Sequence, residues 1–548
     1  MKLRNLIKLS LIPLKLNKIF KRSYQNWNKK KLWILFDKTI EEKAKLSSKN
    51  EGKNILIEGF WDNPNQFLRL NLVLKALSKE KKINFIGLLR NKNDRSKKTL
   101  IAMGVKEFIY IEDTQINRND LNSAKNLLKN IKNHNEIFNL KLPSNLPPHI
   151  FYDTVLKDDK NPQPKLSSQT WVKSLSDIFR LQRFYKKVFT KNKIDLIILS
   201  HPWKNEFGMA IYQGLHLGID CFYLNAMYEM MRIRRFRNFE DLNSPAESIS
   251  YKEFKLLNKF TREKISNAGK CYLELRSQGK NTDINEQKAY SKKQDSKKFL
   301  TKNGINQKKK IVTVFCHAWY DFPHAMGMKN FTDFKDWINL TFKLAQKNKS
   351  VTWIFKPHPA ESWYGGFYLR DLIKKTPDHI HVIDEENSVE AILDISDIVI
   401  TVHGTVAVEA GAKGIPVISA DQNYYQDWPF VETVKNRSAY IKRLETIEKK
   451  DLKIDRKNIQ SARSFAYLSI APAEEKINIQ RLIADHSEPK YLFGNLINLL
   501  NNQSEAINQQ IELIHEWIKS DSQNFCIYHK INFHSLKKFE KSIEEIRK

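Results

Sequence analysis

The sequence is short of cysteine, of long apolar runs and of acidic residues. Its four cysteines, in 548 residues, lie far apart and form no Cys-x-x-Cys pair. This spacing argues against a disulfide framework or a metal site built on cysteine, and it fits a reducing compartment. No run of about 18 apolar residues occurs, so no transmembrane helix is predicted. We therefore expect a cytoplasmic globular protein, in keeping with its 41% hydrophobic content.

The shortage of acidic residues leaves a large positive charge. Lys and Arg number 93 and Asp and Glu number 61, a formal net charge of +32. Such a charge is typical of proteins that bind nucleic acid, anionic lipid or phosphorylated substrates. A platform for nucleic acid also needs aromatic residues among the basic ones. Here only Phe236 and Phe239, beside the arginines of 232–237, meet that condition, so no nucleic-acid partner is predicted.

The amino-terminal segment has a charge pattern of its own. Residues 1–31 carry ten Lys or Arg and no acidic residue, with apolar residues interspersed. One interpretation is a basic amphipathic helix that lies on an anionic membrane surface, which would place the protein on the inner face of the cytoplasmic membrane. The other is a loosely ordered basic arm. A secretory signal is not predicted, because the apolar run ending at Leu14 is short and contains Pro13.

Strands and helices alternate twice along the chain, which predicts parallel sheets. The expected strands of the first unit are 55–57, 84–89, 107–111, 194–199 and 221–224, and those of the second are 311–315, 351–355, 380–383, 398–402 and 416–419. Residues 133–170 are expected to be irregular and 228–308 mainly helical. The fold class is α/β, with two Rossmann-like domains that face a cleft. The predicted divisions are a basic arm (1–50), a first Rossmann-like domain (51–240), a helical segment (241–308), a second Rossmann-like domain (309–440) and a helical extension (441–548).

The most informative stretch is 396–420, which predicts a compact strand–turn–helix–strand unit. The turn is His403-Gly404-Thr405, and a helix that starts there points free N–H groups into the crevice above the sheet, where a phosphate fits. Glu409 lies one turn further on and is suited to a ribose hydroxyl pair. The alternative is an ordinary turn in which Glu409 pairs with Lys413.

Three further polar clusters follow predicted strands, where ligands bind in such sheets. Lys356-Pro-His358-Pro holds a cation and an imidazole in a restricted backbone, which suits a phosphate leaving group or is a plain proline-rich loop. His317, Asp321 and His324 share one loop and are candidates for substrate contact, for a metal or for structural hydrogen bonds. The third cluster consists of Glu58-Gly59 and Ser200-His201-Pro202, in which Glu58 or His201 is a candidate general base.

The KPHP motif, followed about 40 residues later by HGTVAVEAGAKGIPVI, resembles the capsule polysaccharide biosynthesis proteins. These are related to the Kdo- and sialic-acid-transferring glycosyltransferases of the GT-B fold. SHPWKNEFGMAIYQGLHLGIDCFYLN and HAWYDFPH resemble other parts of that family. The resemblance implies that His358 binds the donor phosphate, that Thr405 plays the part of a hydroxyl motif beside His403, and that Glu58 is the base. Its serine pair is replaced here by HGT.

These observations predict an inverting glycosyltransferase that uses neither a metal nor a cofactor. Its donor is a nucleotide sugar, CMP- or UDP-linked, held by Lys356, His358, His403, Gly404, Thr405 and Glu409. Its acceptor is a lipid-linked or growing surface polysaccharide. A nucleotide-sugar 2-epimerase of the same fold is the alternative enzyme, and a non-catalytic basic protein that binds membrane or nucleic acid is the alternative from another class.

Overall fold

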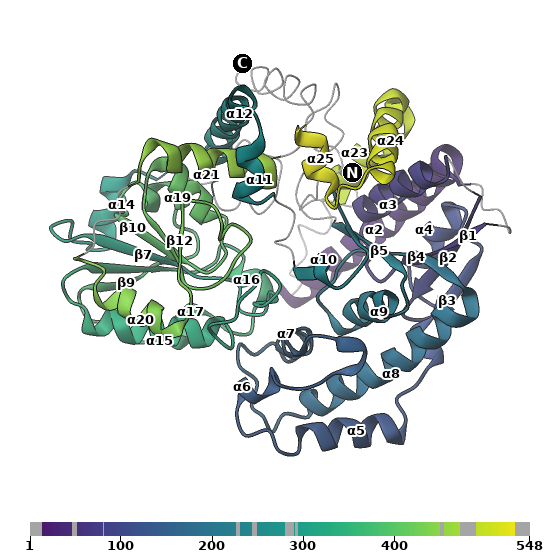
Figure 1. Ribbon diagram of the computed structural model, residues 1–548, viewed down its shortest axis with the longest axis horizontal. Helices are drawn as coiled ribbons and strands as arrows, with labels where there is room; N and C mark the ends of the chain where they lie inside the picture. Colours follow the sequence, from purple (N-terminus) through teal and green to yellow (C-terminus); the bar gives the residue numbers. More distant parts are fainter. Residues whose placement is uncertain are drawn as a thin grey trace.

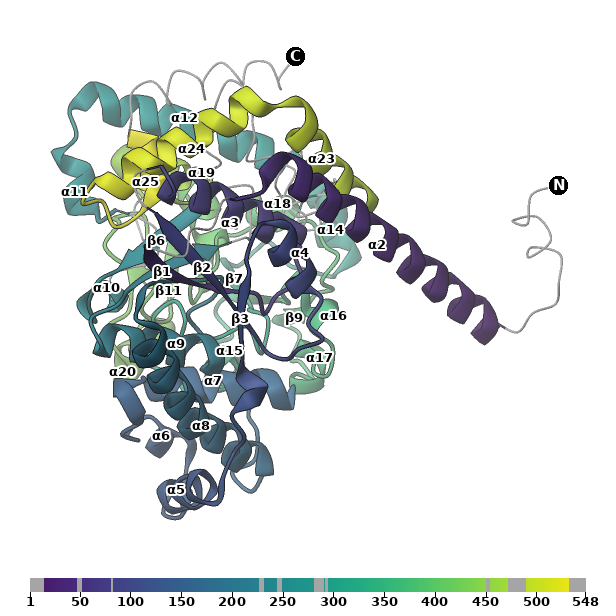
Figure 2. The ribbon, with the colours of Figure 1, turned by 90° about the vertical axis from the view of Figure 1, so that its right-hand side faces the viewer.

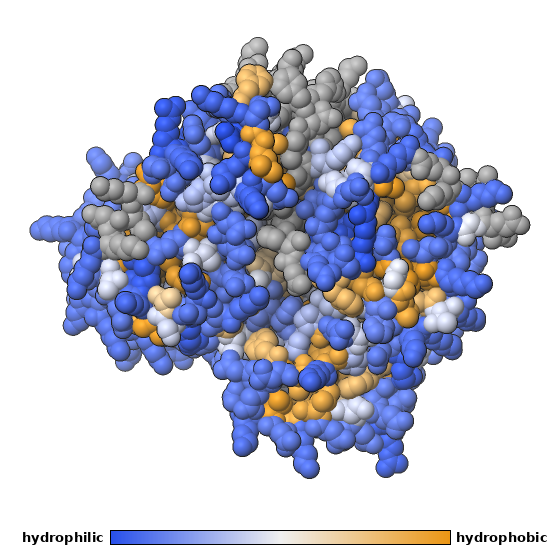
Figure 3. All heavy atoms as spheres, viewed as in Figure 1, coloured by the Kyte–Doolittle hydropathy of each residue, from blue (hydrophilic) through white to orange (hydrophobic). Residues whose placement is uncertain are grey.

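The structure, a computed structural model, describes residues 14–46, 52–79, 82–225, 231–243, 249–279, 290, 294–449, 454–471 and 489–531. Two six-stranded sheets account for the described strands, and each sheet has helices on both faces (Figure 1). The predicted α/β class with two parallel-sheet domains is confirmed, as are the helical segment between the domains and the helical carboxyl-terminal extension. The visible face in Figure 3 is mainly hydrophilic, with separate hydrophobic areas.

The amino-terminal sheet has the strand order β3-β2-β1-β4-β5-β6. Its strands are β1 (Lys53–Glu58), β2 (Ile83–Leu89), β3 (Glu107–Tyr110), β4 (Ile194–Leu199), β5 (Asp220–Asn225) and β6 (Arg232–Phe236). All neighbours run parallel except β5 and β6. The central strands are apolar and buried because helices cover both faces, as a parallel sheet requires. The order changes direction at β1 and β4, so their carboxyl ends flank a crevice.

The helices of this domain form two layers. One core lies under α3 (Pro64–Leu77) and α4 (Ser96–Ala102), and the other lies under α7 (Pro148–Asp159), α8 (Gln169–Asn192) and α9 (Asn205–His216). α5 (Arg118–Leu128) packs against α8 outside the second layer. The short elements η1 (Ile111–Asp113), α6 (His134–Ile137) and η2 (Pro143–Asn145) complete the chain between β3 and α7.

The carboxyl-terminal sheet has the order β12-β11-β10-β7-β8-β9, all parallel. Its strands are β7 (Ile311–Phe315), β8 (Thr352–Lys356), β9 (Ile380–Val382), β10 (Ile398–Thr401), β11 (Val417–Ser419) and β12 (Glu432–Thr433). One face packs on α12 (Lys259–Ser277), α14 (Ser296–Lys302), α18 (Val389–Leu393), α19 (Val406–Lys413) and α21 (Arg456–Ser469). The other packs on α15 (Phe334–Lys347) and α20 (Arg437–Glu445).

Both ends of the described chain belong to the amino-terminal domain. Helix α2 (Leu14–Ala44) packs through Trp33, Phe36 and Ile40 against α23 (Pro489–Asn502), and the rings of Trp33 and Phe493 lie 5.0 Å apart. α24 (Ser504–Lys519) covers α3, and α25 (Phe525–Ile531) follows it. The first half of α2 projects away from the rest of the molecule (Figure 2). The chain therefore crosses back from the second domain to the first.

One local prediction is wrong and a second is incomplete. Residues 133–170 are not simply irregular, because α7 forms within them and packs seven buried residues into the core. The segment 228–308 is helical in α10 (Glu240–Asn243), α11 (Tyr251–Leu256), α12 and α14, but it begins with strand β6. Arginines 232, 234 and 235 mask that strand in the sequence, because a buried strand is normally apolar.

The arginines of β6 have internal partners and do not form an exposed basic surface. Arg234 and Arg235 are each 5% exposed. The Arg235 guanidinium donates to the carbonyls of Trp517, Ile518 and Ser520 at the end of α24, and Arg232 donates to Ser469 O. A cation at a helix carboxyl terminus satisfies carbonyls that have no partner within the helix. These arginines therefore fasten α21 and α24 to strand β6 of the first domain.

Candidate active site

The predicted site residues lie where strands of the two sheets end. Glu58 ends β1, and Ser200 and His201 follow β4. In the other sheet, His317 follows β7, Lys356 ends β8, and His403 follows β10. Because parallel strands end at a common edge, these side chains gather at one edge of each sheet.

Glu58 lies beneath the surface of the first domain and its carboxylate is fully engaged. It is 6% exposed. One oxygen accepts from the Phe60 N–H, and the other accepts from the Ser200 N–H at 3.0 Å and the Ser200 hydroxyl at 2.5 Å. Burial raises the pKa of Glu58, while these hydrogen bonds and the charge of Arg90 oppose the rise. The Glu58 carboxylate is therefore separated from solvent by the residues that cover it.

His201 is the partly exposed group of this cluster. Its Nδ1 lies 2.9 Å from Ser200 Oγ, and its ring lies edge-on to Trp61, with 5.2 Å between the ring centres. Burial lowers the pKa of His201 to about 4, so its imidazole is neutral at pH 7. The charge of Asp321, from the loop after β7, acts on it in the opposite sense. His201 therefore lies within electrostatic range of the second domain.

His317 holds the turn that follows β10. Its Nε2 faces the N–H groups of Val402 (3.3 Å) and His403 (3.4 Å), and it lies 3.1 Å from Thr401 Oγ1. Burial and the neighbouring His403 and His358 keep the pKa of His317 well below its ordinary value. A neutral imidazole that accepts backbone N–H groups is a positioning group. His317 therefore fixes the His403-Gly404-Thr405 turn.

The His403 ring packs at an angle against the ring of His317, and one of its ring nitrogens has no hydrogen-bond partner among the described residues. Its ring centre lies 4.4 Å from that of His317 and 5.5 Å from that of Phe334. Nδ1 is buried and has no hydrogen-bond partner among the described residues. Burial lowers the pKa of His403 to about 4, with Asp321 acting against the shift and with His324 and His358 adding to it. A buried polar atom without a partner is costly, and a ligand group is one way to satisfy it.

Lys356 and His358 of the KPHP loop have different environments. Lys356 is 1% exposed, and its Nζ donates to the carbonyls of Pro357, Asp384 and Glu385, the last at 2.6 Å. Burial lowers the pKa of Lys356 to about 8. His358 is partly exposed, and its Nδ1 accepts from the Ala360 N–H at 3.1 Å. Lys356 thus holds two loops together, while His358 lies at the surface of the site.

Thr405 and Glu409 face the linker helix α12. Arg276 Nε lies 2.7 Å from Glu409 Oε1, and Arg276 Nη2 donates to Thr405 Oγ1 at 3.2 Å. Tyr290 donates to the second oxygen of Glu409. The alternative pairing of Glu409 with Lys413 is wrong, because Lys413 pairs with Glu390 and Asp394. Gly404 lies between them and the sheet, and a Cβ there would meet Thr401 Oγ1 at 2.9 Å.

The loop 317–333 joins the two domains. Asp321 lies 3.5 Å from Lys157 Nζ, and His324 Nδ1 lies 2.6 Å from Asp153 Oδ1, both partners being on α7 of the first domain. Tyr152, also on α7, donates to Asp333 at 2.8 Å. His324 Nε2 is buried and, like His403 Nδ1, has no partner among the described residues. Of the three predicted contacts on this loop, Asp321 is the most exposed and acts on both His201 and His403.

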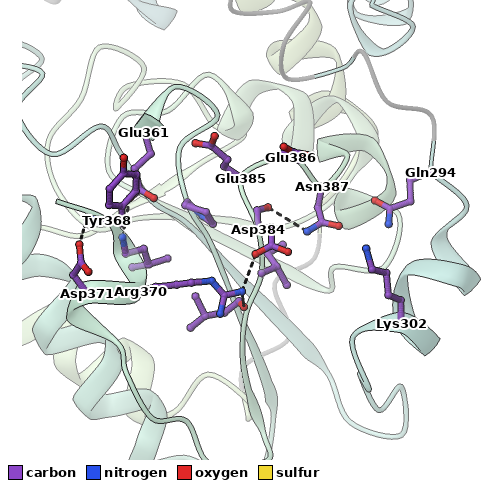
Figure 4. A pocket seen from close by; sticks show the side chains of 14 residues that line it. Gln294, Lys302, Glu361, Tyr368, Arg370, Asp371, Asp384, Glu385, Glu386 and Asn387 are labelled. Atoms are coloured by element: carbon purple, nitrogen blue, oxygen red, sulfur yellow. Dashed lines mark hydrogen bonds and ion pairs between the residues drawn. The ribbon is translucent and has the colours of Figure 1, made fainter. Parts of the chain in front are cut away.

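A cavity of about 860 Å³ opens beside the KPHP loop, at the carboxyl ends of β8 and β9. Its acidic side chains outnumber its basic ones: Glu361, Asp371, Asp384, Glu385 and Glu386 against Arg370 and Lys302. Figure 4 shows Gln294 and Lys302 on the side opposite Glu361 and Tyr368, and Arg370 paired with Asp384 at 2.8 Å. Burial raises the pKa of Glu361 to about 7. Carboxylates suit sugar hydroxyls and amino groups better than they suit phosphates.

No group of three or more His, Cys, Asp or Glu side chains in the described ranges is arranged to hold a metal ion. In the same part of the chain, no helix combines the length and the apolar character needed to cross a membrane.

Sequence reasoning missed several residues of the site. Arg276, Tyr290 and Asp153 lie 133, 119 and 171 residues from their partners. No local pattern marks them, because each is a single polar residue on an amphipathic helix or a loop. Ser200 lies in the Ser200-His201-Pro202 motif, and its position between a strand and a histidine is the signal that marks it.

No protein-family model and no curated protein matches the sequence. Among solved structures, the chain is similar to KpsC, a β-Kdo 2,4 transferase of Thermosulfurimonas dismutans, with 14% identity over 52% of this chain and 85% of that one and a TM-score of 0.33. It is similar to the UDP-GlcNAc 2-epimerase of Methanocaldococcus jannaschii, with 12% identity, coverage of 75% and 97% and a TM-score of 0.24. It is also similar to the wall teichoic acid polymerase TagF, with 12% identity, coverage of 91% and 99% and a TM-score of 0.23.

Proposed function

We propose that the protein is an inverting glycosyltransferase that moves a sugar from a nucleotide-activated donor to a surface-polysaccharide or lipid-linked acceptor. The observation that carries the proposal is the unpartnered imidazole nitrogen of His403, in a turn built by His317, within electrostatic range of His358 and Asp321. Imidazole N–H groups at strand ends, beside the start of a helix, suit the phosphate of a leaving nucleotide.

The donor belongs to the carboxyl-terminal domain in this proposal. His403 and His358 contact the phosphate, and the backbone of Gly404 and Thr405 faces the same place. The acidic cavity beside the KPHP loop takes the hydroxyl-bearing part of the donor. Lys356 and the Arg276–Glu409 pair position these groups, since each is buried and fully bonded.

The acceptor belongs to the amino-terminal domain. The Glu58, Ser200 and His201 cluster supplies the base, and the loop that carries Asp321 brings it close to the donor groups. In an inverting transfer the base removes the proton of the acceptor hydroxyl while the nucleotide leaves from the opposite side of the sugar.

A screen of thermal stability with CMP-, UDP-, GDP- and CDP-linked sugars identifies the donor, because a ligand that binds the folded state raises its apparent stability. The chosen donor is then tested for transfer and hydrolysis with His358→Ala. We expect turnover to fall at least about 100-fold, the scale seen when one stabilising group is removed. His216→Ala, at the exposed end of α9, is the matched control and should keep full turnover. Intact turnover in His358→Ala, or formation of an epimeric sugar without an acceptor, would overturn the assignment.

We also propose that α2 lies on an anionic membrane surface where such acceptors are made. Ile34 and Leu35 are 60% and 50% exposed on α2, with exposed Lys30 and Lys38 near them. An apolar pair beside lysines suits the interface of an anionic bilayer. The variant Ile34→Ser/Leu35→Ser should release the protein from phosphatidylglycerol vesicles, and Leu256→Ser on α11 should not. Equal binding of both variants would contradict this placement.

A further inference from the structure

We propose that Ser200 couples Glu58 to His201, so that His201 Nε2 takes the proton of the acceptor while the buried Glu58 receives the proton of the Ser200 hydroxyl. The inference rests on the proposed transferase function and decides which group of the first domain touches the acceptor. In this assignment His201 is the catalytic residue, and Ser200 and Glu58 are positioning residues.

The geometry of Ser200 carries the assignment. Its hydroxyl lies between two partners, Glu58 Oε2 at 2.5 Å and His201 Nδ1 at 2.9 Å. A hydroxyl has one proton to donate, and an ionised carboxylate can only accept. The Ser200 proton therefore points to Glu58, and the oxygen must accept the proton of His201 Nδ1. The neutral ring then carries its proton on Nδ1 and presents Nε2 as a free lone pair.

The exposure of the two groups agrees with this order. Glu58 is 6% exposed, and both of its oxygens already accept hydrogen bonds, so it offers no open face to an acceptor sugar. His201 is partly exposed, and Nε2 has no hydrogen-bond partner among the described residues. The rings of Trp61 and Phe207, each 5.2 Å away, hold the imidazole in place. The side chain that reaches the acceptor is therefore the histidine.

The charges around His201 come in pairs. Asp321 lies 3.5 Å from Lys157, and Glu206 lies 2.5 Å from Arg90, and all four act on His201. Because each carboxylate is paired with a cation, the surroundings do not hold His201 in its protonated form. Burial lowers its pKa to about 4, which leaves the ring neutral and able to accept a proton at pH 7.

Proton transfer from the acceptor hydroxyl to this cluster leaves His201 and Ser200 neutral and protonates Glu58. The O–H bond of the acceptor breaks as the N–H bond of Nε2 forms. The Nδ1–H proton passes to Ser200 Oγ, and the original Ser200 proton passes to Glu58 Oε2. The ring ends neutral with its proton on Nε2, and Glu58 ends as a neutral acid. Burial raises the pKa of Glu58, which makes the carboxylate a suitable final receiver.

The first experiment determines the His201 tautomer by NMR and does not depend on transferase activity. The chain has 14 histidines, so protein labelled with ¹⁵N-histidine is compared with His201→Asn to assign the ring signals. Two-bond ¹H–¹⁵N correlations distinguish the tautomers. At pH 7 we expect the Nδ1–H tautomer with an unprotonated Nε2. Ser200→Ala should lose this preference, whereas Ser176→Ala, a buried serine that donates to Val172 O, should keep it. An Nε2–H tautomer in the unmodified protein would overturn the proposal.

The second arm measures transfer with the donor found in the stability screen. We expect kcat of Ser200→Ala to fall about 100-fold, the usual scale of one general-base contribution, with KM for the donor unchanged. Ser200→Thr keeps the hydroxyl and should restore most of the rate. A serine that served only to fill space would not show this dependence of kcat on the hydroxyl. An unchanged kcat in Ser200→Ala would also overturn the proposal. If no nucleotide sugar is turned over at all, the transferase function fails, and the tautomer arm still decides the coupling.

Discussion

The His324 ring nitrogen Nδ1 lies 2.6 Å from the Asp153 carboxylate, and this buried pair joins the loop after β7 to helix α7 of the other domain. The same carboxylate accepts the His324 backbone N–H at 3.1 Å. Beside it, Tyr152 donates to Asp333. The relative position of the two halves of the candidate site therefore depends on four side chains, two on α7 and two on the loop after β7.

Replacing Asp153 should loosen that junction. Asp153→Ala leaves His324 buried without its partner, and removing one member of a buried pair costs about 3 kcal/mol or more. Tyr152→Phe deletes a single hydroxyl, for which about 1 kcal/mol is expected. Urea unfolding of both variants checks the order. Equal stability of the two variants would show that the Asp153 pair contributes nothing beyond one hydrogen bond.

Nucleotide-sugar binding should become tighter as pH falls. The pKa of His403 is about 4 in the free protein because of burial, and a bound phosphodiester favours the protonated ring and raises that pKa. Affinity should therefore increase as pH falls from 8 toward 5, by at most tenfold for each unit below the pKa of the complex. Calorimetric titrations from pH 5 to 8 measure the effect. His403→Asn should bind with no such slope; a slope that persists in this variant would assign the proton uptake elsewhere.

Stability at alkaline pH should depend on Lys356. Its pKa is about 8 in the folded protein and near 10.5 when unfolded. Between these values the unfolded chain binds more protons, so this group makes the folded state more stable as pH rises from 8 to 10.5. Over that window, the unfolding free energy of the unmodified protein should therefore rise relative to that of Lys356→Met. A constant difference from pH 7 to 11 would mean that the folded-state pKa is not lowered.

Two glycines provide a matched pair for the packing of the linker helix. A Cβ at Gly269 on α12 would lie 1.8 Å from the backbone oxygen of Arg463 on α21, so Gly269→Ala must force these helices apart. We expect a loss of at least about 2 kcal/mol, as for overpacked cores. At Gly494 on α23 a Cβ has no neighbour within 4 Å, and Gly494→Ala should stabilise the helix by about 1 kcal/mol. In thermal unfolding, Gly269→Ala should melt at a lower temperature than the unmodified protein, and Gly494→Ala should melt at a higher one.

The strands were largely predictable from the sequence. Buried β-branched runs at 311–315 and 398–402 mark β7 and β10, and His403-Gly404-Thr405 marks the turn after β10. Helix α19 (Val406–Lys413) follows the turn as that stretch predicts, and Gly414 ends it with φ of +81°, which glycine adopts readily. By contrast, the sequence does not predict β6, because its arginines look exposed. Their partners are helix-end carbonyls far along the chain.

The sequence by itself determined that two parallel sheets form and that polar residues stand at the ends of their strands, because both properties depend on local periodicity. Only the tertiary structure decided how those residues are used. Glu409 meets Arg276 across 133 positions, Glu58 meets Ser200 across 142, and Asp153 meets His324 across 171. Such pairs depend on how whole elements pack, so no pattern along the chain reports them. It is this packing that buries Glu58 and leaves His201 at the surface of the site.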